Sequence, residues 1–188
     1  MAIARTPERV RAWRRARFAP SVYSVDEAGN QTWARHPDQR MHGRSTVKLL
    51  TAAAARGILT DLDASHRVLA DCVVGEPKTI RPGDTITVSD LFHASIIESD
   101  ALATGRLTRA AGTIVLGGTA TREEAQSRFI TEMHAFATRI GWTGHTVTDP
   151  LGFGWTNAFT ARDLVTLLRW VQHNDPWLNE IAGKLTHI

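Results

Sequence analysis

The hydrophobic and polar positions of the chain follow a strand pattern near the N-terminus and a helix pattern over most of the remainder. Residues 21–25 and 31–35 are short β-favouring runs on either side of a turn that contains Gly29 and Asn30, and this arrangement predicts a β-hairpin. From Ser45 onward, alanines and leucines continue without interruption to Gly57. We therefore expect a helix there, with Gly57 in the left-handed conformation just after its C-terminus.

Three later segments also carry helical patterns. A second run begins near Ser89, where Ser89 or Asp90 is expected to cap the helix. Residues 121–124 (TREE) and 160–163 (TARD) have the form of capping boxes that open a third and a fourth helix. The apolar positions of these two helices are Phe129, Met133, Phe136, Ala137 and Ile140, followed by Leu164, Leu167, Leu168 and Val171. Their spacing of three and four predicts that one face of the third helix belongs to the core, and Gly141 is expected to end that helix.

The remaining pattern fixes the fold class that we expect. Residues 61–87 are mixed and contain a turn at residues 82–84, so no element is assigned to them. The outline is one early hairpin followed by mostly helix, which is an α+β chain without internal repeats. At 188 residues and 43% hydrophobic content, it fits one domain over residues 21–188, preceded by an arginine-rich leader or linker over residues 1–20.

Composition and charge exclude several classes of function. A net charge of +3 with scattered arginines does not favour nucleic-acid binding. No apolar run is long enough for a membrane span, and no signal peptide is recognisable. The single cysteine, Cys72, forms no internal disulfide and is expected to be a small buried residue. The histidines show no metal-ligand spacing, so neither a metal nor a cofactor is expected.

The candidate chemistry lies at the start of the first predicted helix, in the stretch RSTVKLLTAAAAR (residues 44–56). Ser45 and Lys48 are three residues apart, so their side chains share a face and can touch. A serine hydroxyl is a poor nucleophile unless a neighbour takes its proton. A lysine can do so once it is neutral, whereas an arginine stays protonated. The backbone N–H groups at the helix start are also suited to a developing oxyanion.

Each residue of this pair also has a purely structural interpretation. Ser45 would then be the N-cap of the helix, and Lys48 would be a solvated residue on its surface. The four late tryptophans have a similar interpretation as core residues: Trp142, Trp155, Trp170 and Trp177. Trp155 lies in a glycine-rich loop, where lining a groove is the alternative.

Three blocks of the chain, in order, resemble the penicillin-binding D-alanyl-D-alanine carboxypeptidases of the serine transpeptidase and β-lactamase-like superfamily. Residues 21–52 look like the family's opening hairpin and Ser-x-x-Lys helix, and residues 81–107 look like the segment through its second motif, Ser-x-Asn. Residues 128–170 are similar to the family's capped Thr-Ala-x-Asp-Leu helix and the loop before it. The resemblance implies that Ser45 is the acylated nucleophile and that Lys48 is its general base or proton relay.

The second and third family motifs are altered. Aligning Ser99-Asp100-Ala101 with Ser-x-Asn keeps the serine and replaces the asparagine by Ala101, whereas aligning Ile97-Glu98-Ser99 loses the first serine. We prefer the first alignment because it leaves Ser99 able to pass a proton to the leaving group. No Lys-Thr-Gly triplet occurs in the sequence. The family strand that carries it is therefore expected to be absent, which leaves the sheet beside the hairpin incomplete.

The resemblance implies a function, a partner and a location. The expected function is a serine-type D-alanyl-D-alanine carboxypeptidase-like hydrolase that acts on peptidoglycan stem peptides through an acyl-enzyme at Ser45. The alternative is a catalytically impaired cell-wall-binding or structural module, for example part of a bacteriophage tail. Either self-association or a partner chain covers the open sheet edge, or the helices shield it, or the chain is one segment of a longer protein. The expected location is the extracytoplasmic cell wall or a virion.

Overall fold

Helices form most of the protein, which is seen here in a computed structural model that describes residues 19–70 and 79–184. A 3-10 turn, η1 (Arg44–Thr46), leads directly into α2 (Val47–Arg56). The other described helices are α3 (Val88–Ile97), α4 (Ala101–Val115), α5 (Arg122–Arg139), α6 (Ala161–Asn174) and α7 (Pro176–Gly183). Most of the leader expected at residues 1–20, and Cys72, lie outside the described residues.

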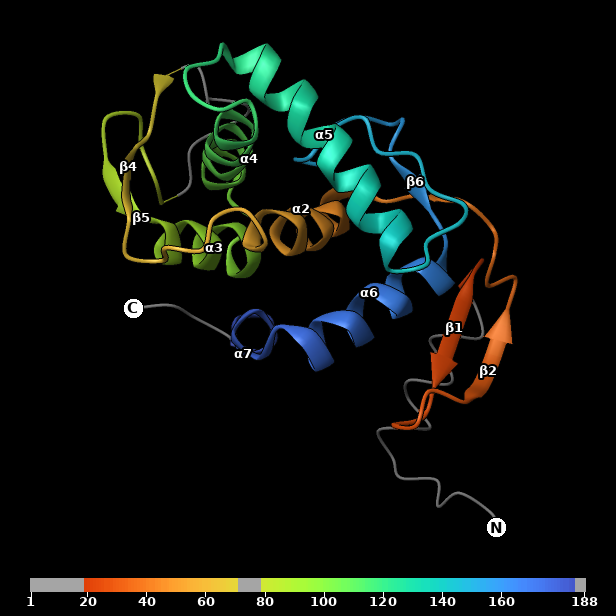
Figure 1. Ribbon diagram of the computed structural model, residues 1–188. Coiled ribbons are helices and arrows are strands. Elements are labelled where there is room, and N and C mark those ends of the chain that lie inside the picture. Colours follow the sequence, from red (N-terminus) through yellow and green to blue (C-terminus); the bar gives the residue numbers. More distant parts are fainter. Residues whose placement is uncertain (1–18, 71–78, 185–188) are drawn as a thin grey trace.

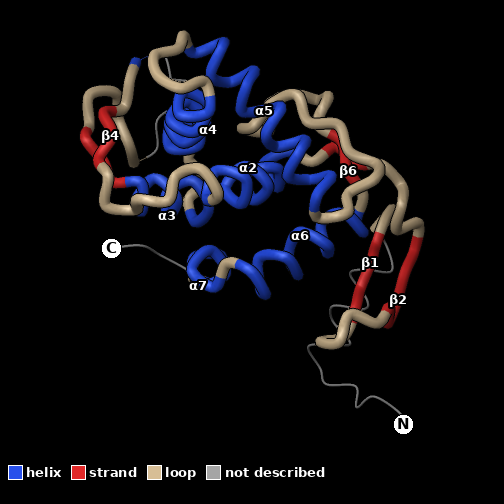
Figure 2. The backbone as a smooth tube through the Cα atoms, in the orientation of Figure 1, coloured by secondary structure: helices blue, strands red, loops and turns tan. Residues whose placement is uncertain are grey.

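The described strands are short and pair into three separate two-stranded antiparallel sheets. β1 (Val22–Val25) pairs with β2 (Gln31–Arg35), which confirms the predicted hairpin. β3 (Met41–His42) pairs with β6 (Ala158–Phe159), and β4 (Ser65–Arg67) pairs with β5 (Thr85–Thr87). Figure 2 shows the small strands at the margins of a helical body. The expected α+β class is confirmed.

Helix α2 lies at the centre of this body. α3, α4 and α5 pack around it, and α6 and α7 lie beneath it in Figure 1. Eight of its ten residues are buried, and they include a run of four alanines, residues 52–55. Small side chains allow neighbouring helix backbones to approach closely. No helix in the described ranges is long and apolar enough to cross a membrane.

Several predicted helix boundaries are confirmed and others are wrong. The capping boxes of Thr121 and Thr160 are both formed, and Gly141 follows α5 with a φ of 96°. Gly57, however, is right-handed with a φ of −69°. The chain leaves α2 without a left-handed residue because the N–H groups of Ile58 and Leu59 both donate to the Ala55 carbonyl.

The predicted second helix begins at Val88, next to the expected Ser89, but its cap is a different residue. Neither Ser89 nor Asp90 is the cap, because Thr87, the last residue of β5, accepts a hydrogen bond from the Asp90 N–H at 3.0 Å. The strand therefore passes straight into the helix. Residues 98–100 then break the run between α3 and α4. Within the fourth predicted helix, Leu167 and Val171 are buried, whereas Leu168 is exposed.

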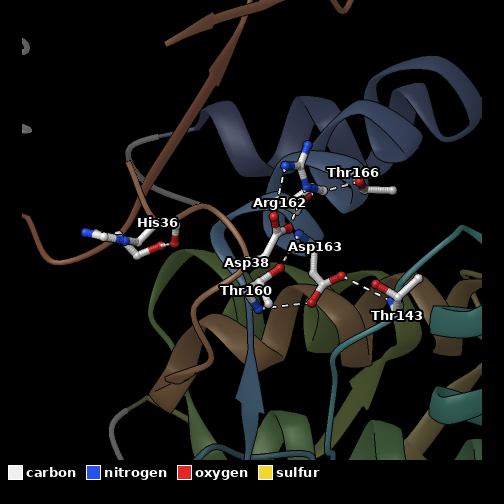
Figure 3. Close-up of polar contacts among 8 residues, drawn as sticks. His36, Asp38, Thr143, Thr160, Arg162, Asp163 and Thr166 are labelled. Atoms are coloured by element: carbon white, nitrogen blue, oxygen red, sulfur yellow. Dashed lines mark hydrogen bonds and ion pairs between the residues drawn. The ribbon is translucent and has the colours of Figure 1, made fainter. Parts of the chain in front are cut away.

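The N-terminus of α6 joins the hairpin side of the molecule to the loop before β6. Asp163, which is buried, accepts hydrogen bonds from the backbone N–H groups of Thr160 and Thr143. Arg162 forms a bidentate ion pair with Asp38, which belongs to the segment after β2. Figure 3 shows these contacts converging on the first turn of α6. Because β1 packs against it, α6 supports the hairpin.

Two histidines are expected to make stability depend on pH. Burial is the main cause that lowers the pKa of His66, and the charge of Arg106 lowers it further. Burial is also the main cause that lowers the pKa of His145, and the neighbouring His134 lowers it further. The folded protein therefore binds fewer protons than the unfolded chain, and the stabilisation from the neutral rings is complete above about pH 6.5 and is lost as the pH falls further. We expect the melting temperature to decrease between pH 7.5 and 5.5. A decrease that is unchanged in H66Q/H145Q would contradict this origin, and H173Q, at an exposed site, is the matched control.

Candidate active site

Lys48 is buried at the start of the central helix. Its side chain is 4% exposed, although it carries an ionisable amine and belongs to the first turn of α2. Long side chains on a helix point back toward the helix N-terminus, and here that direction leads to Ser45 in the preceding 3-10 turn. The interpretation of Lys48 as a solvated surface residue is therefore wrong.

Ser45 is exposed and lies within reach of the Lys48 amine. Lys48 Nζ is 3.2 Å from Ser45 Oγ, and no side-chain hydrogen bond caps either η1 or α2. The interpretation of Ser45 as the N-cap is therefore wrong as well. A reactive hydroxyl must be accessible to a substrate while its proton acceptor is shielded from water, and this pair has that arrangement.

Ser99 reaches the same amine from a corner between two helices. Lys48 Nζ is 3.1 Å from Ser99 Oγ, and Ser99 has a φ of 54°, which few non-glycine residues adopt. The corner is fixed by the next residue, Asp100, which is buried and caps α4 by accepting a hydrogen bond from the Ala103 N–H at 2.9 Å. The structure thus brings Ser45, Lys48 and Ser99 together.

The helix start offers fewer free donors than the sequence suggests. The Thr46 N–H donates to the Gly43 carbonyl at 3.1 Å, and the Val47 N–H donates to the carbonyls of Arg44 and Ser45. These two amides are engaged in the 3-10 turn and are not free to stabilise an oxyanion. The expectation that the backbone N–H groups at this helix start are free is therefore wrong for Thr46 and Val47.

A loop from the C-terminal half of the chain is pressed against the 3-10 turn that carries Ser45. Gly152 has a φ of 85°, and a Cβ on it would lie 2.3 Å from the Arg44 carbonyl oxygen and 2.9 Å from the Ser45 nitrogen. Thr51 of α2 also donates to the Pro150 carbonyl at 2.7 Å. Only a residue without a side chain allows the loop to lie this close to Ser45.

Two aromatic side chains of this loop border the pair. The Phe153 ring centroid is 5.9 Å from Lys48 Nζ, and the Trp155 ring lies under the Arg44 guanidinium at 3.9 Å.

Trp142 is buried, as expected, whereas Trp155 is 63% exposed, so the core interpretation is wrong for Trp155. The sequence predicted a glycine-rich loop at Trp155, with groove lining as the alternative to core packing, but it gave no role to Arg44, Gly152 or Phe153. The density of turn-forming residues in Asp149-Pro-Leu-Gly-Phe-Gly154 is the signal for this turn.

Comparison with protein families gives one match over nearly the whole chain. A family model described as the Beta-lactamase enzyme family matches residues 8–180. Comparison with curated proteins gave no match.

Solved structures of related enzymes share the fold. A D-alanyl-D-alanine carboxypeptidase from Francisella tularensis has a TM-score of 0.73 at 22% identity, covering 88% of this chain and 39% of that one. A penicillin-binding protein homologue from Mycobacterium tuberculosis has a TM-score of 0.74 at 25% identity, with coverages of 88% and 60%. The Streptomyces K15 DD-transpeptidase has a TM-score of 0.72 at 25% identity, with coverages of 82% and 62%. The chain thus spans less than two thirds of each of these relatives.

Proposed function

Because this chain belongs to the β-lactamase enzyme family, whose members are serine hydrolases, we propose that it is a D-alanyl-D-alanine carboxypeptidase-like hydrolase of peptidoglycan stem peptides. The observation that carries the proposal is the placement of Lys48 Nζ, 3.2 Å from Ser45 Oγ and 3.1 Å from Ser99 Oγ. An amine between two hydroxyls can take a proton from one and return it through the other. The likeness to carboxypeptidase and transpeptidase structures supports the same reaction class.

In the proposed reaction, Ser45 Oγ attacks the carbonyl carbon of the penultimate D-alanine while its proton passes to neutral Lys48. The peptide C–N bond then breaks, and the proton reaches the departing D-alanine nitrogen through Ser99. Water hydrolyses the resulting Ser45 ester and restores the hydroxyl.

The partner and location in this proposal follow from the substrate. The partner is the peptide stem of peptidoglycan, so the protein would act in the extracytoplasmic cell wall or from a virion that contacts it, such as a bacteriophage tail. Both assignments rest on the substrate class that the family resemblance implies.

The proposal is tested by covalent modification of the full chain. We expect a fluorescent penicillin to add once per molecule, as measured by the mass of the intact protein, and peptide mapping to place the adduct on Ser45. A heat-unfolded sample is the control for non-specific acylation. Release of D-alanine from a peptide ending in D-Ala-D-Ala then measures turnover. No adduct at high protein concentration would contradict the proposal.

A second function is favoured by one feature of the sequence. Ala101 stands where the preferred alignment expects an asparagine. This feature suits a catalytically impaired module that binds the cell wall. This alternative predicts binding to purified peptidoglycan that is unchanged in S45A and K48A, with no release of D-alanine by any form.

Replacement of Gly152 by alanine is expected to slow acylation strongly. The new Cβ would meet backbone atoms of Arg44 and Ser45, which cannot rotate away, and a φ of 85° is itself unfavourable for alanine. The loop and the nucleophile turn must therefore separate, and a displacement of about 1 Å can cost about 10²-fold in rate. The rate of labelling by the fluorescent penicillin measures the effect. G154A is the control, because its Cβ would meet first only the rotatable hydroxyl of Thr156, at 3.3 Å.

A further inference from the structure

Two large aromatic side chains are exposed beside the turn that carries Ser45. Phe153 is 51% exposed and Trp155 is 63% exposed. Phe153 lies near Lys48 Nζ, and Trp155 lies against Arg44 and, edge to face at 5.7 Å, against His42. We call Phe153 and Trp155 the aromatic ledge. Exposed aromatic side chains next to a reactive group are typical of a binding surface.

The aromatic ledge is held rigidly. The Asp149 carboxylate accepts hydrogen bonds from the N–H groups of Leu151, Phe153 and Gly154 at 2.8, 2.6 and 2.8 Å. Asn157, which is fully buried, accepts from the Asp149 N–H at 3.1 Å and donates to the Asp149 carbonyl at 2.6 Å. The exposure of the two rings is therefore imposed by an ordered loop, and a ligand would meet them with little further ordering.

Arg44 adds a positive charge to the ledge at the residue before Ser45. Its guanidinium is exposed and stacks on the Trp155 ring at 3.9 Å. Among the residues that the structure describes, no carboxylate forms an ion pair with it. Stacking on one face leaves the N–H groups along the edge of a guanidinium available for bidentate binding of a carboxylate.

The backbone at Arg44 also favours a functional role for this side chain. Its φ is 46°, in the left-handed region where glycine, asparagine or aspartate is more easily accommodated. An arginine therefore stands in this sequence where a smaller residue would fit the backbone better. A role for the guanidinium at the site accounts for its presence.

We propose that Arg44 and the aromatic ledge form a subsite for the free carboxylate of an acyl-peptide substrate and the apolar group next to it. The carboxylate binds the edge of the Arg44 guanidinium, and the adjoining methyl or methylene groups lie against Phe153 and Trp155. The inference deepens the proposed function, on which the identity of the peptide rests. It places recognition of the peptide carboxylate on the turn that carries the nucleophile.

The test compares two peptides that differ only in charge. N,N-diacetyl-L-Lys-D-Ala-D-Ala and its C-terminal amide are titrated into the full-length S45A protein, which cannot be acylated, and binding is followed by NMR or calorimetry. We expect the free acid to bind about tenfold or more tightly than the amide, the range for a charge-assisted hydrogen bond. In S45A/R44Q the two peptides are expected to bind equally, and in S45A/W155L both are expected to bind more weakly. S45A/R67Q, which removes an exposed arginine on β4, is the matched control and is expected to keep the preference.

The outcomes separate this subsite from the catalytic proposal. Equal binding of acid and amide by S45A, no binding of either, or a preference that survives in S45A/R44Q would overturn the subsite. If wild-type protein is acylated at Ser45 but S45A shows no preference, the subsite alone fails. If the preference is present and disappears with R44Q while wild-type protein is not acylated, the subsite is supported and the catalytic proposal fails.

Discussion

Substitution of Ser45 by alanine is expected to abolish covalent labelling by a β-lactam, and substitution of Lys48 is expected to slow it by about 10²–10⁴-fold, the range for loss of a general base. S45A removes the only atom that would form the ester. K48R carries a guanidinium that stays protonated and cannot accept a proton, and K48M keeps a long side chain without a basic group. Both Lys48 variants are therefore expected to be slow, as measured by the initial rate of labelling with a fluorescent penicillin.

Folding and non-specific reaction are controlled separately in this comparison. S24A removes a hydroxyl of the hairpin that contacts Thr32 at 2.9 Å, and it is expected to be labelled like the wild type. K48M is expected to fold, because methionine is a long, flexible side chain that fills a similar volume without burying a polar group. A K48R protein that is labelled at the wild-type rate would refute the role of Lys48 as the base.

Substitution of Gly112 by alanine is expected to destabilise the fold, although alanine is the better helix former. Gly112 lies within α4, and a Cβ on it would be 2.0 Å from the Ala125 carbonyl oxygen of α5. The clash is with backbone, so α4 and α5 must move apart, and overpacking of this kind costs about 1–3 kcal/mol. For a protein of this size, each kcal/mol lowers the melting temperature by about 2–4 °C.

The matched control for this prediction is another helical glycine. Gly183 is the last residue of α7, is exposed, and has no atom within 4 Å of an added Cβ. G183A is therefore expected to be neutral or slightly stabilising, by up to about 1 kcal/mol from helix propensity. Thermal unfolding of both variants gives the comparison. A G112A protein at least as stable as G183A would contradict the close α4–α5 contact.

The parts of the fold that depend on local sequence were predictable. The capping boxes at Thr121 and Thr160 are formed because each needs only residues three apart. The hairpin follows from two β-favouring runs around a turn. The strands β3 and β6 could not be found, because each has two residues and pairs with a partner more than a hundred positions away. The cap of α3 was not predicted, because the capping residue, Thr87, is also the last residue of strand β5.

The candidate site divides in the same way. The spacing of Ser45 and Lys48 lies within one helical turn, so the sequence alone determined that the two side chains share a face. Only the tertiary structure decided that Lys48 is buried, that Ser99 of the α3–α4 corner meets it, and that the loop of Gly152 and Phe153 lies beside it. Burial and these long-range contacts arise when α2 is enclosed by helices from the rest of the chain. Periodicity identifies which face of a helix is apolar, but only packing determines what that face, and a lysine on it, will touch.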